Sequence, residues 1–379
     1  MVSTSSELIF NLIPRLFVWM LLILIVIIIV TFIFDISQSK NAILRNYPVV
    51  GHFRYLFSNL GEFFRQYFFA MDREEMPFNR AEREWVNRAS KDKDNTIAFG
   101  STKNLNTPGS IIFINSFFPS LDSDAVQTKS ISIGEGYSKN PYTANSIFNI
   151  SGMSYGSISK PAVLALSGGA KKADCWMNTG EGGLSSYHLK GGADLVFQIG
   201  TAKYGVRNDD GSLNDQKLAD IAKHDQVKMF EIKISQGAKP GKGGILPGIK
   251  INTEISKIRG IPKGVDSISP NRHIEVSSSS ELLDMINHVR NISEKPVGFK
   301  TVIGHIRFLE DLLDEINKRG HESAPDFITI DGGDGGTGAA PMELLDNVGL
   351  PLRESLPRVL STIIQYGLKD RIKVIASGK

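Results

Sequence analysis

The chain is poor in cysteine, which limits the sites it can build. It has 379 residues and a single cysteine, Cys175. One thiol excludes an internal disulfide framework and any cysteine-ligated zinc or iron–sulfur centre made by this chain alone. Net charge is also low, because 43 Lys and Arg against 40 Asp and Glu leave +3. That balance argues against binding of nucleic acid through its phosphates, and no such partner is expected.

Several catalytic and cofactor motifs are missing as well. The first strand expected in the C-terminal part is not followed by G-x-G-x-x-G, which counts against a dinucleotide-binding fold. No Cys–His arrangement indicates hydrolysis. His188, His273 and His305 lack a metal-ligand spacing such as H-E-x-x-H, so no metal site is expected.

Glycine is scarce in the first quarter of the chain and abundant after it. Only Gly51 and Gly61 precede residue 100, and the other 34 of the 36 glycines fall in the last 280 residues. Tight backbone turns of the kind found in ligand-binding loops are therefore expected in the C-terminal three-quarters.

A long uncharged run lies near the N-terminus. Residues 16–34 read LFVWMLLILIVIIIVTFIF, in which Thr31 is the one polar side chain. At 1.5 Å per residue the run nearly matches a hydrocarbon core of ~30 Å. A signal peptide would have a shorter apolar core followed by a small-x-small cleavage site, which does not occur here. We therefore predict a short tail, 1–15, and a retained single-pass transmembrane helix, 16–34.

The charges that flank this run predict its orientation. Lys40, Arg45 and Arg54 follow the run closely, whereas Arg15 alone precedes it. Because cytoplasmic flanks carry the excess of Lys and Arg, the C-terminal bulk should lie on the cytoplasmic side of a membrane.

Residues 35–145 form a connecting region rich in aromatic and charged residues. Phe64 and Phe68 share one helical face, and Glu62 and Arg65 interrupt the apolar run, so a second membrane span is not expected. We expect amphipathic helices that either lie on the membrane surface or pack on the globular domain. The sequence favours neither of these two arrangements.

From about residue 146 to 379, strands, Gly-rich loops and helices alternate. Repeated units of this kind imply an α/β fold with a parallel sheet. Because polar or Gly-rich loops follow nearly every strand, a (β/α)₈ barrel is favoured over a doubly wound sheet with one switch point. The expected strands are 146–150, 175–178, 229–234, 296–302, 327–330 and 371–376.

Two loops carry candidate chemistry of their own. The glycines of 332–338 expose backbone N–H groups that could cradle a phosphate or approach a flat ring. Asp331 and Asp334 would repel a phosphate, so they are expected to bind hydroxyls or brace the loop. Glu231 and Lys233 share one face of a strand, where two charges need a ligand or each other. Lys233 could hold negative charge on an electron-accepting ring or simply pair with Glu231.

A set of short strings in this order carries a family resemblance. The strings are RNYPVVGH at 45–52, SGMSYG at 151–156, NTGEGG at 178–183, EIKISQGAKPG at 231–241, the segment 331–341, GLP at 349–351 and GLKDR at 367–371. Together they resemble the FMN-binding glutamate synthase family, specifically its membrane-anchored, single-protein branch. The likeness runs from about residue 40 to the end.

The resemblance implies an FMN-bearing barrel that joins ammonia to 2-oxoglutarate and reduces the product to glutamate. It implies catalytic roles for Lys233 and Glu181, since a cation beside the flavin stabilises its reduced anion. It implies contacts to the 2-oxo acid substrate from Lys239, Arg259 and Ser277. It implies flavin contacts from Met153, Ser154, Thr179, Lys233, Gln236, Gly335, Gly336, Thr337, Gly338, Ser377 and Gly378.

The sequence also departs from the family pattern. The family has Gln in a G-G-Q-L-P-G string where this chain has Ile245, which cannot hydrogen-bond an oxo acid. The chain stops just after the expected strand 371–376, which by resemblance looks like strand seven of the family barrel, so we expect a barrel that is incomplete after strand seven. An iron–sulfur cluster is expected only if a longer form supplies its cysteines.

Three alternatives therefore stay open. The first is an FMN electron-transfer enzyme that acts on another substrate, a membrane quinone or a donor protein. The second is a non-catalytic anchored remnant. The third is a flavin-free, phosphate-binding barrel.

Overall fold

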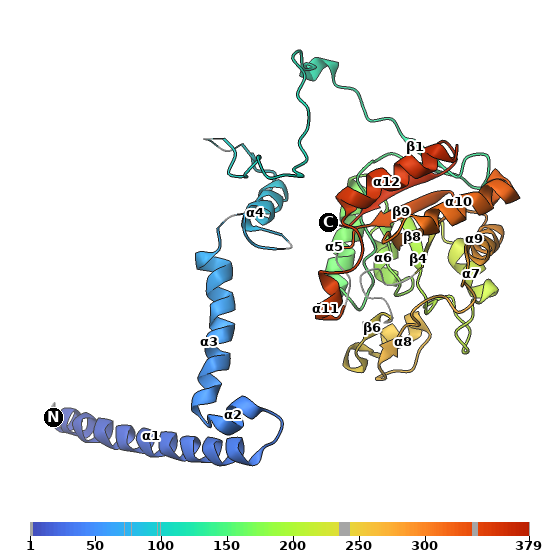
Figure 1. Cartoon of the computed structure of the whole chain (residues 1–379). Coiled ribbons are helices and arrows are strands. Elements are labelled where there is room, and N and C mark those ends of the chain that lie inside the picture. Colours follow the sequence, from blue (N-terminus) through green and yellow to red (C-terminus); the bar gives the residue numbers. More distant parts are fainter. Residues whose placement is uncertain are drawn as a thin grey trace. The chain divides into compact units, whose positions relative to one another are not determined.

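The computed structural model describes residues 3–71, 73–76, 78–96, 98, 100–234, 243–335 and 340–378. The chain divides into two compact units, Met1–Pro119 and Ser120–Lys379 (Figure 1), and each is described by itself.

The first unit is helical. One stretch of its first helix, Ile13–Ser37, is long and apolar enough to cross a membrane, and none of its most apolar window is buried. Length and composition alone support a membrane span here. The helices are α1 (Ser3–Ser37), α2 (Ala42–Asn46), α3 (Val50–Phe64), the π-helical turn η1 (Arg65–Phe69) and α4 (Arg80–Ala89).

The second unit is built on a parallel sheet of six strands. The strand order is β10-β9-β8-β5-β4-β3, and every neighbouring pair is parallel. Ile150 makes an isolated parallel bridge to Met177, which adds a seventh strand position beside β3. The strands are β3 (Met177–Asn178), β4 (Leu195–Ile199), β5 (Val227–Lys233), β8 (Val297–Val302), β9 (Phe327–Asp331) and β10 (Lys373–Ser377).

The sheet curls into part of a barrel, and helices follow its strands (Figure 1). The predicted α/β class and incomplete parallel barrel are therefore confirmed. The helices are α5 (Lys160–Lys172), α6 (Ser186–Lys190), α7 (Asp215–Ala222), α8 (Thr253–Arg259), α9 (Ser279–Ser293), α10 (Arg307–Arg319), α11 (Met342–Leu345) and α12 (Leu352–Gln365), with 3₁₀ turns η2 (Asp122–Asp124), η3 (Gly248–Lys250) and η4 (His321–Ser323).

Two short antiparallel strand pairs complete the second unit, and η3 and α8 lie between the two strands of the second pair. One pairs β1 (Ile131–Ile133) with β2 (Tyr142–Ala144). The other pairs β6 (Ile245–Leu246) with β7 (Ser267–Ile268). The first pair packs its buried residues with Trp176, Val196, Met229 and Phe327, so it covers side chains that several strands present.

The core lies between the sheet and its helices. Phe197, Phe230 and Phe299 are fully buried on three adjacent strands. A buried Phe contributes about 1.5–3 kcal/mol relative to an exposed one. Helix α10 buries Leu309, Leu312, Leu313 and Ile316, the apolar stripe expected at helical spacing.

Candidate functional site

A buried carboxylate lies where the parallel strands approach their carboxyl ends. Glu231 of β5 is 2% exposed. Its Oε1 accepts hydrogen bonds from Asn178 Nδ2 at 2.8 Å and Gln198 Nε2 at 2.7 Å. Its Oε2 accepts one from the Thr329 hydroxyl at 2.6 Å. These donors belong to β3, β4 and β9, so one side chain ties four strands together, and its buried charge is compensated by hydrogen bonds.

Lys233 lies two residues further along β5 and pairs with a residue of another loop. Its Nζ is 3.0 Å from Glu181 Oε1, and the two side chains are 15% and 21% exposed. The pair therefore joins the end of β5 to the turn that follows β3, rather than Lys233 to Glu231. Gly200, after β4, leaves no room for a Cβ beside the Glu181 side chain, so the pair is confined on that side. The arrangement presents a cation that is partly open to a ligand.

A second buried cation lies on the neighbouring strand. Lys300 of β8 is 3.2 Å from Asp331 Oδ2 at the end of β9. Burial acts to lower the pKa of Lys300, but Asp331 and Glu231 outweigh it and raise that pKa. Lys300 therefore stays protonated, and Asp331 pairs with it at the end of β9, where the Gly-rich loop begins.

The Gly-rich loop after β9 meets the end of β10. Gly332 N–H donates to Ser377 O at 3.1 Å. Gly378 has a φ of +86°, and a Cβ at this position would clash with Asp331 Oδ1 and Gly332 N. Gly335 lies against Gly378, and Ser377 Oγ is 3.1 Å from the Oγ of Ser151. This contact between two hydroxyl groups therefore joins the segment after the first strand position to the end of β10.

The segment after the first strand position is held by the turn after β3. Met153 N–H donates to Asn178 O at 3.2 Å, and Gly180 N–H donates to Asn178 Oδ1 at 2.9 Å. Gly180 has a φ of +64°, and a Cβ there would lie 2.6 Å from Ser154 N, so only glycine permits this close approach. Thr179 is buried, and its hydroxyl donates to Gly180 O at 3.0 Å.

Two buried histidines fix the backbone of this site. His188 Nε2 is 3.2 Å from Met153 O, and Ser185 Oγ is 2.8 Å from Nδ1 of the same ring. His273 Nε2 is 3.0 Å from Lys233 O. Since a carbonyl only accepts, both rings carry their proton on Nε2 and donate it. Burial lowers the pKa of His188 and takes that of His273 to about 4, so both rings are neutral near pH 7.

Residue spacing does not reveal these positioning histidines. Their partners are main-chain carbonyls of residues far away in the chain, and a backbone carbonyl leaves no trace in residue spacing. From the sequence, His188 and His273 were candidates only for metal ligands. In the structure each ring donates Nε2–H to a carbonyl and holds that segment in place.

Arg259, an expected substrate contact, is 6% exposed at the end of α8. Its guanidinium lies 5.0 Å from the centre of the Tyr204 ring, and Nη2 is 3.5 Å from Tyr155 O. Nε is buried and finds no hydrogen-bond partner among the described residues. A Cβ at Gly182 would lie 3.2 Å from Nη2, which brings Arg259 next to the turn that carries Glu181.

Other expected contacts are placed differently or lie outside the described residues. The Ser277 hydroxyl donates to Glu281 Oε2 at 2.6 Å and so helps to begin α9. Ile245 is half-buried and pairs with Ile268 across the β6–β7 strand pair. The expected contacts Gln236, Lys239, Gly336, Thr337 and Gly338 lie outside the described residues.

A cavity of about 590 Å³ lies within the partial barrel. Its wall includes Ser151, Asn178, Lys300 and Gly378, which were described above, together with Trp176 and other apolar residues. A volume of this size, apolar for the most part and with a few converging polar groups, is typical of small-molecule sites.

Comparisons with known proteins agree with this geometry. A sequence profile described as "Conserved region in glutamate synthase" matches residues 100–379. The "Glutamate synthase large subunit-like protein YerD" of Bacillus subtilis is 40% identical in an alignment 390 positions long, which covers 92% of this chain and 73% of that protein.

Two further relatives have names that state an activity. The "Archaeal-type glutamate synthase (NADPH)" of Dehalococcoides mccartyi is 35% identical over 228 residues, 60% of this chain and 42% of that protein. The "Archaeal glutamate synthase (NADPH)" of Methanocaldococcus jannaschii is 35% identical over 231 residues, with the same two shares. The chain thus spans about two-fifths of the length of these two relatives.

Proposed function

Because the chain belongs to the glutamate synthase family, we propose that it is a membrane-anchored, FMN-dependent oxidoreductase that converts 2-oxoglutarate and ammonia to glutamate. The observation that carries the proposal is the Lys233–Glu181 pair, 3.0 Å apart at the carboxyl ends of parallel strands. Loops at that end of a barrel are where such enzymes build their sites.

The residues around this pair fit a flavin mononucleotide. Gly335 and Gly378 lie against each other where the Gly-rich loop begins. Backbone N–H groups of such a loop suit a phosphate or a ring edge. Lys233 supplies positive charge, and Met153 and Thr179 belong to the neighbouring segments, where Met153 is exposed and Thr179 is buried. When bound, FMN would supply hydride transfer. The chain's own task is to hold the group and to place a cation beside it.

The expected substrate cations are Lys239 and Arg259. Arg259 has an unpartnered, buried Nε among the described residues, and a guanidinium can clamp a carboxylate with two hydrogen bonds. Glu181 lies between Lys233 and Arg259. Its carboxylate would keep the charged groups of Lys233 and Arg259 apart and oriented. A 2-oxo acid dianion is the substrate class that two such cations suit.

The apolar helix Ile13–Ser37 supports a membrane tether. Lys40 and Arg45 on its C-terminal flank favour a cytoplasmic position for the second unit. Ile245 supports a second candidate function: an FMN enzyme that passes electrons to another acceptor, such as a membrane quinone. An apolar side chain at this position gives a 2-oxo acid no hydrogen bond.

The test uses the full chain purified from membranes in mild detergent. We expect it to carry, or to take up, FMN that is released on denaturation. With [15N]ammonium, 2-oxoglutarate and either NADPH or dithionite as reductant, we expect labelled glutamate by mass spectrometry. Bound FMN without glutamate would favour the electron-transfer candidate. A chain that neither carries nor binds FMN would contradict the proposal and favour the non-catalytic alternative.

A matched pair of lysines on β5 tests the role of the cation. Lys233→Met should lower the reduction potential of bound flavin, because a nearby positive charge stabilises the reduced anion. Lys228→Met removes a lysine from the same strand that is 37% exposed and 4.0 Å from Asp194. This control should leave the potential unchanged. Equal potentials in both variants would show that Lys233 does not lie beside the flavin.

A further inference from the structure

Helix α3 and the turn η1 that continues it carry a long apolar face that is exposed. At 100° per residue, eight large apolar residues between Val50 and Phe69 fall within one arc of the helix surface. All eight are between 38% and 66% exposed. Most of their ring contacts are with one another, as between Phe63 and Tyr67 at 5.0 Å, and Phe64 also contacts Phe69. The eight, which we call the aromatic face, are Phe53, Leu56, Phe57, Leu60, Phe63, Phe64, Tyr67 and Phe68.

The opposite side of the same helix is mainly polar, and Tyr55 and Phe69 are the aromatic residues that also fall there. Arg54, Ser58, Glu62 and Arg65 fall in a single arc there, and all four are exposed. A helix with aromatic and aliphatic residues on one side and Arg-bearing polar residues on the other is typical of helices that lie in a membrane interface. An exposed apolar face of this length is otherwise unusual on a soluble surface.

Hydrogen bonds hold the first turn of α3 against the end of the apolar helix α1. Asp35 is fully buried and accepts a hydrogen bond from Val49 N–H at 2.8 Å. Nε2 of His52 lies 3.0 Å from both oxygens of the same carboxylate. Asn41 Nδ2 donates to the Tyr55 hydroxyl at 2.8 Å. These contacts, which we call the elbow, fix the point at which the chain turns from α1 into α3.

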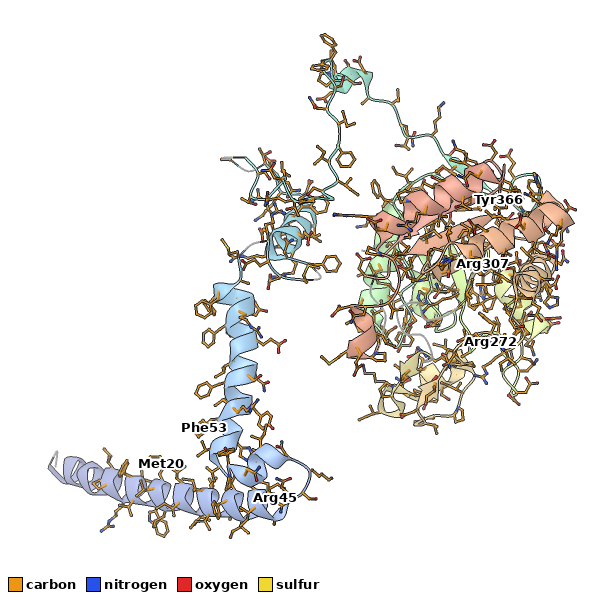
Figure 2. The ribbon with its side chains drawn as sticks, in the orientation of Figure 1. Met20, Arg45, Phe53, Arg272, Arg307 and Tyr366 are labelled. Atoms are coloured by element: carbon orange, nitrogen blue, oxygen red, sulfur yellow. The ribbon has the colours of Figure 1, made fainter. Side chains whose placement is uncertain are left out.

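Beyond the elbow, α3 runs across the direction of α1 (Figure 1). Figure 2 shows Phe53 near the end of α3 that meets α1 and α2. If α1 crosses a bilayer, its C-terminal end at Asp35 reaches the interface between lipid and water. A helix that starts there and runs across α1 must follow the membrane surface.

We propose that α3 and η1 lie flat in the membrane interface, with the aromatic face in lipid and Arg54 and Arg65 among the headgroups. The length from Val50 to Phe69 gives about 30 Å of helix along the surface at 1.5 Å per residue. Aromatic side chains favour this zone because their rings accept both apolar and polar surroundings. The proposal uses α1 as an anchor and depends on neither FMN nor the substrate.

The test measures which side of α3 contacts lipid. Single cysteines for nitroxide labelling are placed in a Cys175→Ala background at neighbouring positions on opposite sides, as Phe57→Cys and Ser58→Cys. The full chain is reconstituted in vesicles of phosphatidylcholine and phosphatidylglycerol, and relaxation by oxygen, which enters lipid, is compared with relaxation by a water-soluble nickel chelate. We expect the oxygen-to-nickel ratio to be several-fold higher at position 57 than at position 58.

Further labels separate the possible outcomes. Ile25→Cys reports on α1. The pair Phe64→Cys and Glu62→Cys repeats the comparison of the two sides further along α3, so that the test still works if one of the first two labelled variants fails to fold. If position 25 is in lipid while 57 and 58 are equally open to nickel, the interfacial helix is overturned and the anchor stands. If 57 is shielded from both reagents, protein covers the aromatic face, and the proposal is again overturned.

Discussion

His273 illustrates how single side chains of the site are kept in one protonation state. It is 1% exposed, donates to Lys233 O, and lies near Lys203 and Glu275. Burial is the largest cause of its lowered pKa, and the charge of Lys203 acts in the same direction. The neutral ring therefore holds the main chain at Lys233, while the Glu181 carboxylate pairs with its ammonium group.

The lowered pKa of His273 predicts how stability depends on pH. The folded pKa is about 4, against about 6.5 in an unfolded chain, so the unfolded state binds more protons between these values. The stabilisation is therefore complete above pH 6.5 and is lost as the pH falls toward 4. It amounts to roughly 3 kcal/mol at most. His188, also lowered by burial, acts with the same sign.

Unfolding by urea, followed by near-ultraviolet circular dichroism between pH 4 and 7.5, measures this dependence. His273→Gln keeps an N–H donor but does not titrate, so the loss of stability toward low pH should become less steep. His224→Gln replaces an exposed histidine and should keep the slope of the parent chain. A slope that His273→Gln leaves unchanged would contradict the assignment of a neutral, buried ring.

Local pattern placed two charged residues of the site but did not give their partners. The alternation along β5 correctly placed Glu231 and Lys233 on one strand as candidates for a charged site. It could not give their partners, because Glu231 is held by side chains of three other strands and Lys233 by the turn after β3. Such contacts depend on strand order, which residue spacing does not encode.

At the scale of elements, apolar runs followed by Gly-rich loops predicted most of the sheet. Strands β5, β8, β9 and β10 lie within two residues of the expected bounds. Strand β4, Leu195–Ile199, was not predicted, because the helix before it has only five residues and no Gly-rich string follows it. The expected strand 146–150 forms only the bridge at Ile150. Both differences lie where the strands and helices themselves are short.

The amino ends of the strands are joined by a buried ionic network centred on Asp326, just before β9. Its Oδ2 lies 3.0 Å from Arg290 Nε of α9 and accepts from Val297 N–H of β8 at 2.8 Å. Its Oδ1 lies 3.0 Å from Arg371 Nη1, before β10. All three charged side chains are 8% exposed or less. The network therefore connects one helix to three neighbouring strands.

Removing the central charge should destabilise the second unit strongly. Asp326→Asn leaves two buried guanidinium groups without their carboxylate, which typically costs about 3–5 kcal/mol. Asp220→Asn breaks an exposed pair with Lys223, whose side chains are 56% and 70% exposed, and should cost at most about 1 kcal/mol. Urea unfolding of both variants gives the comparison. Equal losses would show that the buried network does not support the sheet.

For the molecule as a whole, family membership and the apolar helix bear on different units. The family profile covers 100–379, whereas the membrane-length helix and its elbow lie within the first unit. Sequence reasoning could identify both, since one depends on a long uncharged run and the other on several short strings in order. It could not show the elbow, because the buried Asp35 and its partner His52 meet only through the turn at α2.

The orientation of the chain in a membrane is the prediction that belongs to this scale. Lys40, Arg45 and Arg54 lie within 20 residues of the end of the 16–34 run, and Arg15 alone precedes it. Positive charge near a membrane helix is retained on the cytoplasmic side. A fluorescent protein fused to the C-terminus and expressed in a bacterial host should therefore be bright, and alkaline phosphatase at the same position should be inactive.

A charge-shifted variant provides the matched control for this experiment. Replacing Lys40, Arg45 and Arg54 by Gln leaves Arg15 as the flanking charge, so a larger fraction of chains should insert with the C-terminus outside. Phosphatase activity should then rise relative to the parent fusion, because that enzyme is active only after export. Phosphatase activity in the parent fusion itself would overturn the orientation. The second unit would then lie outside the cytoplasm, away from the NADPH or ammonia on which the proposed glutamate-forming reaction would depend.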